Sequence, residues 1–485
     1  MTLSAAFNTV QTMFGNHGTQ SDVITKNVAN QQNTAYGRRT AVTTSTLYGG
    51  AFVTIQRAQD YALLRQSLTA TSQDSAQKAL ATGLNRLSSI FGGNEQPFAP
   101  STYLNNLYKS LSDYAAKPSD RTLGAAVVNN AQSLAGALND ASSAVQKVRA
   151  DADREISLQV DKLNDLLRQF HEANDAVMSA SAAGMDANDE MDVREGVLNK
   201  ISEIVGVNVL RREPNDMVLY TSDGTTLFES SPRAVTFTPT MAYGATVAGN
   251  SIKIDGVPVT PGTGANTTGQ GTLSALLQLR DEVAPVLQNQ LDEMARGLVT
   301  AFAETDGGVP PTIMAGLFTY GTGAVPVAGT VVPDLASVIR VNPAVDPALG
   351  GDPSKLRDGS INGAAFNRNT GNNASFSAVL VGYGRALDTP MPFDPVAQLD
   401  SSASLMTYAT KPIGWLEDIR QSATDSATKK SALKVHSAEA YSNATGVSLD
   451  EEMSLMLNLQ QSYKATAQIL SAIDEMIKSL LNAAG

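Results

Sequence analysis

The side chains that most often carry chemistry are few and widely separated in this 485-residue sequence. Three histidines, His17, His171 and His436, fall in three different segments with helical periodicity, and there is no cysteine. A zinc site or a nucleophilic triad needs several such groups to converge on one point. We therefore expect each histidine to be a packed or exposed helix residue, and we expect no catalytic residue, metal site or cofactor.

One acidic segment comes closest to a metal loop, and it contains Asp186, Asp189, Glu190 and Asp192. A calcium loop that began at Asp186 would need glycine and then a bidentate glutamate at two set positions. Met191 and Val197 occupy those positions. We interpret the segment as a solvated loop that leads into a helix.

Sequence motifs of the common enzyme classes are also missing. The chain has 38 glycines but no Walker A motif, no GxSxG elbow and no GxGxxG after a predicted strand. The formal net charge of −12, without a basic patch, argues against a nucleic-acid partner. The composition therefore offers no positive reason to propose an enzyme.

The elements that position the remaining candidate residues begin with an amphipathic helix at the N-terminus. Apolar or small side chains recur there in steps of three and four, at Leu3, Phe7, Val10, Phe14, His17, Ser21, Ile24 and Val28. Residues 1–37 contain only two Asp, Glu, Lys or Arg side chains, and the opposite face is Ser, Thr, Asn and Gln. A solvent-exposed helix normally carries Lys and Glu, so we predict a helix surrounded by other protein, with an ordinary core helix as the alternative.

A second helix of the same type is predicted at the C-terminus, with apolar positions Met456, Leu459, Tyr463, Thr466, Leu470, Ile473, Ile477 and Leu480. Ser448 and Glu451 have the spacing of a reciprocal N-terminal cap. Two heptad helices at opposite chain ends predict pairing, either with each other or with neighbouring copies.

The region between them is predicted to hold long helices and a smaller β domain. Heptad spacing marks helices through residues 80–91, 131–148 and 156–177, and a helix over 273–302 that is bent at Pro285. From Gly206 the pattern changes to short strands separated by Asn215-Asp216, Asp223-Gly224 and Asp255-Gly256. Residues 307–400 are predicted to be loops and irregular β structure, and helical periodicity resumes near Ser402.

The sequence also bears on export and on membrane insertion. The N-terminus lacks the basic and apolar regions of a cleaved signal peptide, and there is no apolar run of 18 residues. We expect neither a cleaved signal nor a membrane span.

Several motifs resemble those of flagellar axial proteins. Asn27-Val28-Ala29-Asn30 followed by Tyr36-Gly37-Arg38-Arg39 is similar to the N-terminal signature of hook, rod and junction subunits. The run Gly446–Glu452 with Gln460-Gln461 resembles the ending of the FlgK, or hook-associated protein 1, family. Two internal blocks, Asp192–Val207 and Gly271–Pro285, are similar to segments of the same family.

This resemblance implies a mainly α fold with a smaller β domain, in an elongated multidomain axial protein. It assigns residues 1–44 and 441–485 to paired terminal coiled-coil helices. It assigns 45–205, 272–306 and 401–440 to a helical bundle, and 206–271 with 307–400 to an outer β-rich domain.

The function implied is a non-enzymatic structural subunit of the bacterial flagellum at the hook–filament junction, required for filament assembly and motility. The alternatives are a hook or distal-rod protein and, of another class, an extracellular enzyme carried on the axial scaffold. Implied partners are hook protein, the second junction protein, further copies of the chain and an export chaperone on the C-terminal helix. The resemblance also implies an extracellular location, reached by the flagellar type III route.

The apolar stripes and the two motifs together nominate an assembly interface. Its expected residues are Leu3, Phe7, Val10, Phe14, Ile24, Asn27, Asn30, Tyr36, Arg38, Leu449, Met456, Leu459, Tyr463, Leu470, Ile473, Ile477 and Leu480. The periodicity leaves open whether their apolar members pack between subunits or only within one.

Overall fold

The computed structural model describes residues 3–33, 35–45, 51–92, 97–321 and 323–484. Helices predominate, and the strands form small antiparallel sheets, which confirms the predicted mainly α class. The chain divides into two compact units. Unit 1 contains residues 1–74, 162–235 and 429–485, and unit 2 contains 75–161 and 236–428. The division of the chain into three regions proposed above stays a prediction.

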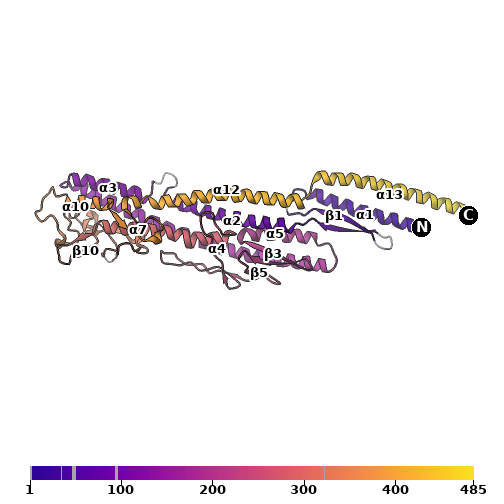
Figure 1. Cartoon of the computed structure of the whole chain (residues 1–485), viewed down its shortest axis with the longest axis horizontal. Helices are drawn as coiled ribbons and strands as arrows, with labels where there is room; N and C mark the ends of the chain where they lie inside the picture. Colours follow the sequence, from indigo (N-terminus) through magenta and orange to yellow (C-terminus); the bar gives the residue numbers. More distant parts are fainter. Residues whose placement is uncertain (1–2, 34, 46–50, 93–96, 322, 485) are drawn as a thin grey trace. The chain divides into compact units, whose positions relative to one another are not determined.

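Unit 1 holds both ends of the chain. Its first elements are α1 (Leu3–Ala29), the hairpin of β1 (Arg39–Ser45) and β2 (Ala51–Arg57), and the start of α2 (Tyr61–Ser89). It continues with the end of α4 (Arg121–Ala182), α5 (Asn188–Ile204), β3 (Val207–Arg212), β4 (Asp216–Thr221) and β5 (Thr226–Phe228). The end of α12 (Lys411–Thr445) and α13 (Leu449–Ala484) complete it. Helices α1 and α13 pack side by side, with the two termini at the same end (Figure 1).

Unit 2 contains the rest of α2, α4 and α12, together with α3 (Pro100–Ala116), α6 (Thr272–Gln278) and α7 (Ala284–Ala301). Shorter helices are α8 (Leu335–Val338), α9 (Ser354–Asp358), α10 (Ala378–Asp388) and α11 (Leu405–Tyr408). Its short strands are β7 (Lys253–Ile254), β8 (Val257–Pro258), β9 (Glu304–Thr305), β10 (Ile313–Met314), β11 (Phe318–Thr319), β12 (Arg340–Val341), β13 (Pro390–Pro392) and β14 (Ser402–Ser404). Strand β6 (Val235–Thr236) lies at the boundary of the two units.

The long helix α4 corrects one prediction. Two helices were expected through 131–148 and 156–177, but a single helix of 62 residues runs through both. The intervening residues contain neither glycine nor proline, so nothing there ends the helix. Leu134, Leu138 and Leu163, which follow its apolar stripe, are fully buried.

The helix is irregular near Pro285, where it contains a π-helical turn, while the predicted bend itself stays a prediction. Residues Leu279–Val283 form this turn between α6 and α7, and Pro285 follows within the first turn of α7. Proline has no N–H to donate to the preceding turn, which favours such an irregularity.

The predicted strands after Gly206 are also present. Strands β3, β4 and β5 form one antiparallel sheet in that order. Asn215, at the turn between β3 and β4, and Asp255, between β7 and β8, both have positive φ, which suits the Asn and Asp found there. Residues 307–400 contain more helix than expected. Gly382 and Gly384 within α10 obscure its short apolar pattern, Leu380, Tyr383 and Leu387.

None of the described helices has a segment that is both long and apolar enough to cross a bilayer.

Candidate assembly interface

The terminal helices meet each other within one chain. The rings of Phe14 on α1 and Tyr463 on α13 contact edge to face, with centroids 5.1 Å apart. The Nε2 atom of His17 lies 3.2 Å from Oγ1 of Thr466. The prediction that the two heptad helices pair is therefore confirmed for pairing within the chain, while contacts between copies stay a prediction.

The residues nominated from the sequence differ in how far this pairing buries them. Those that are buried are Val10, Ile24, Asn27, Tyr36 and Ile473. Those that are half-buried are Leu3, Phe14, Asn30, Arg38, Met456, Leu459, Leu470 and Ile477. Those that are exposed are Phe7, Leu449, Tyr463 and Leu480.

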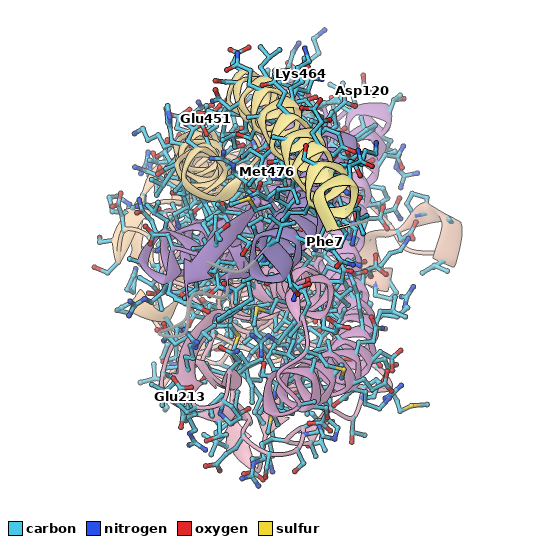
Figure 2. All side chains as sticks on the ribbon, turned by 90° about the vertical axis from the view of Figure 1, so that its right-hand side faces the viewer. Phe7, Asp120, Glu213, Glu451, Lys464 and Met476 are labelled. Atoms are coloured by element: carbon cyan, nitrogen blue, oxygen red, sulfur yellow. The ribbon has the colours of Figure 1, made fainter. Side chains whose placement is uncertain are left out.

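The outer surface of the α1–α13 pair still carries large apolar side chains. Phe7 on α1 is 45% exposed, and on α13 Met453, Leu457 and Met476 are also exposed. Figure 2 looks at this end of the chain and labels Phe7 and Met476. The pair therefore buries only part of the apolar surface that its two stripes provide.

The N-terminal motif forms a closed turn around the buried side chain of Asn27. Its Oδ1 atom accepts hydrogen bonds from the Tyr36 hydroxyl (2.8 Å) and the Arg39 backbone amide (3.1 Å). Its Nδ2 atom donates to the Arg39 carbonyl oxygen at 2.8 Å. Asn30 donates from Nδ2 to the Lys26 carbonyl oxygen at 3.0 Å. These two amides satisfy backbone groups where α1 ends and the chain turns back, as the sequence predicted.

Arg38 connects this turn to the start of α13. Its backbone N–H donates to the Thr445 carbonyl oxygen at 2.7 Å, and its guanidinium group pairs with Glu451 and Glu452. Helix α13 begins directly after Ser448, as predicted. The Glu451 carboxylate lies on Arg38, whereas the sequence suggested that it would cap the helix.

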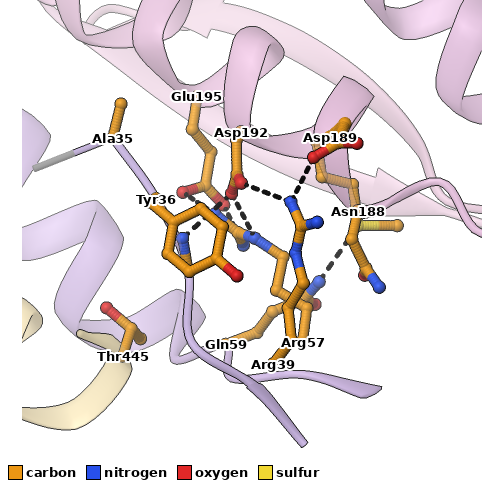
Figure 3. Close-up of polar contacts among 12 residues, drawn as sticks. Ala35, Tyr36, Arg39, Arg57, Gln59, Asn188, Asp189, Asp192, Glu195 and Thr445 are labelled. Atoms are coloured by element: carbon orange, nitrogen blue, oxygen red, sulfur yellow. Dashed lines mark hydrogen bonds and ion pairs between the residues drawn. The ribbon is translucent and has the colours of Figure 1, made fainter. Parts of the chain in front are cut away.

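The two arginines at the base of the β1–β2 hairpin face three carboxylates on α5 (Figure 3). The Arg57 guanidinium binds Glu195 through two parallel hydrogen bonds of 2.9 and 2.8 Å, and donates from Nε to Asp192 at 2.7 Å. Arg39 pairs with Asp189 and Asp192. Both arginines are buried, but the Asp189 side chain is 77% exposed. The Arg57–Glu195 pair is buried on both sides, so it is protected from water and its geometry matters.

The pKa shifts follow from this arrangement. Burial opposes the charged form of Arg57, but its hydrogen bonds and charge interaction with Glu195 outweigh that effect and raise its pKa. Burial raises the pKa of Tyr36 to about 12, against the opposing effect of the nearby Arg39 guanidinium. Tyr441 of α12 donates to Glu195 at 2.8 Å, and burial raises its pKa. Arg57, Tyr36 and Tyr441 therefore keep one protonation state near neutral pH, so their contacts are suited to holding elements together.

Sequence reasoning missed Arg39, Arg57, Asp189, Glu195 and Tyr441 as members of this site. The sequence did contain a signal for part of this site, because Arg39 belongs to the N-terminal motif and Asp192 opens one of the internal blocks that resemble the family. The acidic segment, interpreted from the sequence as solvated, supplies Asp189 and Asp192 to these arginines.

The histidines lie apart from this cluster. The His171 ring lies 5.7 Å from the Phe228 ring, and His436 is exposed on α12. Within the described ranges, no group of three or more His, Cys, Asp or Glu side chains has an arrangement that would hold a metal ion.

Comparison with known proteins identifies two matching segments. Residues 84–307 match the flagellar hook-associated protein FlgK helical domain, and residues 438–483 match the C-terminal model of the flagellar basal body rod FlgEFG proteins. Flagellar hook-associated protein 1 of Salmonella typhimurium is 24% identical over 306 residues, covering 58% of this chain and 52% of the relative. The same-named protein of Bacillus subtilis is 22% identical over 410 residues, covering 79% of this chain and 76% of that relative.

A solved structure also matches, the flagellar hook junction protein FlgK from Burkholderia pseudomallei. It has 20% identity and a TM-score of 0.43, and covers 53% of this chain and 47% of that one. The chain spans about half the length of the Salmonella relative. The FlgK helical-domain match and the curated relatives point to the same proteins: this chain is similar to flagellar hook-associated protein 1.

Proposed function

We propose that this chain is a non-enzymatic structural subunit of the bacterial flagellum that forms the junction between hook and filament. The observation that carries the proposal is the α1–α13 pair, which joins both ends of the chain and still exposes large apolar side chains. Large apolar side chains left exposed in this way are typical of protein interfaces. The relatives are named flagellar hook-associated protein 1, which supports a place of assembly next to the hook.

In this proposal the α1–α13 pair is the innermost part of the assembled subunit. Exposed side chains such as Phe7, Leu457 and Met476 become buried against neighbouring copies, and each contributes about 1.5 to 3 kcal/mol when fully removed from water. The other axial partners are hook protein on one side and the second junction protein on the other. Residues 45–205, 272–306 and 401–440 form the surrounding bundle, and 206–271 with 307–400 face outward.

The chain must be exported before it assembles, and until then its apolar segments must be kept from associating with one another. We propose that the chain leaves the cell unfolded through the flagellar type III route, with a chaperone bound to the α13 segment beforehand. The support is that the apolar stripe of α13 lacks its α1 partner in an unfolded chain and would drive self-association. Removing residues after Gly446 should abolish capture of the chaperone in a pull-down. Unchanged capture would show that the chaperone recognises another segment.

Deletion of the gene followed by electron microscopy tests the junction role. The expected phenotype is intact hooks without filaments, non-motile cells and monomeric flagellin in the medium, all reversed by the full chain. Filaments of normal number and length on the deletion strain would contradict the proposal.

A hook or distal-rod role is the second candidate, because the C-terminal segment matches a model built on rod proteins. The same deletion distinguishes the two roles. Loss of a rod or hook component removes the hook itself, whereas loss of a junction subunit leaves the hook in place.

A further inference from the structure

A cavity of about 390 Å³ lies within unit 2, beside the π-helical turn between α6 and α7. Its walls come from α2, α12, the segment from α6 into α7, the loop before α6 and the loop between β13 and β14. Many of the lining side chains are apolar, among them Leu80, Leu84, Pro285, Val286, Trp415 and Ile419. Small-molecule sites have volumes of about 300 to 1,000 Å³ and mostly apolar walls with a few polar groups, so this cavity has the size and lining of such a site.

The charged groups of the lining are two neighbouring carboxylates of the π-helical turn, Asp281 and Glu282. The charge of Asp281 is compensated, because the buried Arg280 guanidinium donates to its two carboxylate oxygens at 2.8 and 2.7 Å. Glu282 is half-buried, and it forms no hydrogen bond or ion pair with any residue in the described part of the chain. Burial and the nearby charge of Asp281 both raise the pKa of the Glu282 carboxyl group. A cation bound beside Glu282 would therefore stabilise a carboxylate that the chain itself leaves uncompensated.

The single tryptophan of the sequence, Trp415 on α12, is half-buried and lines the same cavity. The face of an indole ring attracts cations, and the ring also provides a large apolar surface. Among the described residues that line the cavity there is no Lys, Arg or His, so its own walls supply no positive charge. The lining therefore suits a molecule that has both a positive charge and an apolar body.

We propose that this cavity binds a small organic cation, an ammonium ion that carries an apolar group such as an aromatic ring. The ammonium group pairs with the Glu282 carboxylate, and the apolar group packs against Trp415 and Pro285. An organic anion would be repelled by Glu282, and a neutral apolar molecule would cover this carboxylate without giving it a partner, which is costly. A metal ion would find two carboxylates, of which Asp281 is already bound to Arg280.

The inference does not depend on the junction role, because the cavity lies in unit 2 and the α1–α13 pair lies in unit 1. Trp415 makes the test direct, since no other tryptophan contributes to the fluorescence of the chain. The purified full chain is titrated with phenethylammonium, and phenethyl alcohol and phenylacetate serve as the neutral and anionic probes. We expect Trp415 fluorescence to change to saturation with phenethylammonium, at one ion per chain in calorimetry, and the affinity to exceed that for the alcohol about tenfold or more.

Two matched pairs of variants locate the site. Glu282→Gln removes the charge without changing the shape, and Glu155→Gln makes the same change at a half-buried glutamate of α4 outside the lining. Val396→Phe narrows the cavity from the β13–β14 loop, and Val381→Phe makes the same change on α10; these valines are 47% and 48% exposed. We expect Glu282→Gln to weaken binding of phenethylammonium about tenfold and Val396→Phe about fivefold or more, while both controls bind like the unaltered chain. Circular dichroism of each variant checks that it is folded.

Three results would overturn the inference. Folded chain that shows no saturable binding of phenethylammonium would mean that the cavity takes no such cation. Equal affinities for the ammonium ion and the alcohol would show that the charge of Glu282 plays no part. Binding that neither Glu282→Gln nor Val396→Phe weakens would place the ammonium ion elsewhere on the chain. Each of these outcomes leaves the junction role untouched, because the deletion strain tests that role separately.

Discussion

The hydroxyl group of Tyr36 donates a hydrogen bond of 2.8 Å to the Oδ1 atom of Asn27. The same carboxamide also bonds both the backbone N–H and the carbonyl oxygen of Arg39. One buried side chain thus holds the end of α1 against the start of the β1–β2 hairpin. This places Arg39 where it meets the carboxylates of α5.

Replacing Asn27 by alanine should loosen this turn strongly. The change leaves the Tyr36 hydroxyl and two backbone groups of Arg39 without partners, and we expect a loss of about 2 to 4 kcal/mol in local stability. Hydrogen–deuterium exchange of peptides from residues 20–45 measures it. Asn30→Ala is the control, since its amide bonds an exposed carbonyl, and it should cost less than about 0.5 kcal/mol. Equal effects of the two changes would contradict the role given to Asn27.

At position 57, a positive charge alone should not be enough to keep the β1–β2 hairpin stable. Arg57→Lys keeps the charge but cannot form the two parallel hydrogen bonds to Glu195, and we expect a loss of about 3 kcal/mol. Exchange protection of the β1–β2 hairpin reports the change. Arg168→Lys, at an exposed ion pair with Asp165 in the same unit, should change stability by less than about 0.5 kcal/mol. Full protection of the hairpin in Arg57→Lys would show that the fork geometry is unimportant.

The pairing of the terminal helices can be tested on α13 with two isoleucines. Ile473 is 6% exposed and Ile469 is 48% exposed. Ile473→Ala should weaken the pair by about 2 kcal/mol and increase exchange in α1, while Ile469→Ala should leave exchange in α1 unchanged. If Ile469→Ala loosened α1 as much as Ile473→Ala, the assignment of the buried face of α13 would be wrong.

The buried carboxyl group of Asp292, on α7, should make the stability of unit 2 depend on pH. Burial raises the pKa of its carboxyl group to about 7, although the backbone amides of Ala336 and Asp334 donate to it at 2.8 and 2.9 Å. The folded state holds this proton more tightly than the unfolded state does. The contribution of Asp292 to the free energy of unfolding is therefore most favourable at pH values below about 4. That contribution falls as the pH rises to about 7, and it is constant above this value.

The change Asp292→Asn removes this titration. The stability difference between the unaltered chain and the variant should therefore decline between pH of about 4 and about 7 and then level off. Trp415, the only tryptophan, lies in unit 2, so its fluorescence during urea unfolding follows the relevant part of the chain. A difference that does not vary over this range, or a carboxyl group that titrates near its ordinary value in NMR, would contradict the prediction.

The sequence by itself determined the elements whose cause is local. Heptad spacing is enough to predict α1 and α13, and the turn residues Asn215 and Asp255 are enough to locate two hairpins. Pro285 locates the irregular turn between α6 and α7, because a missing N–H acts on its own helix. The resemblance of the N-terminal motif identified Asn27, Tyr36 and Arg38 as residues of interest before their contacts were known.

Only the tertiary structure decided which partner each of these residues meets. Arg57 and Glu195 are 138 positions apart, and no periodicity connects a hairpin arginine with a particular carboxylate on α5. The same holds for Arg38, whose ion pairs place the end of the first motif on the start of α13. A helical stripe shows that a face must be covered but does not show by what, because the hydrophobic effect is non-directional. For this reason the burial of Ile473 and the exposure of Ile469, four residues apart on one helix, became known only once α1 and α13 were seen together.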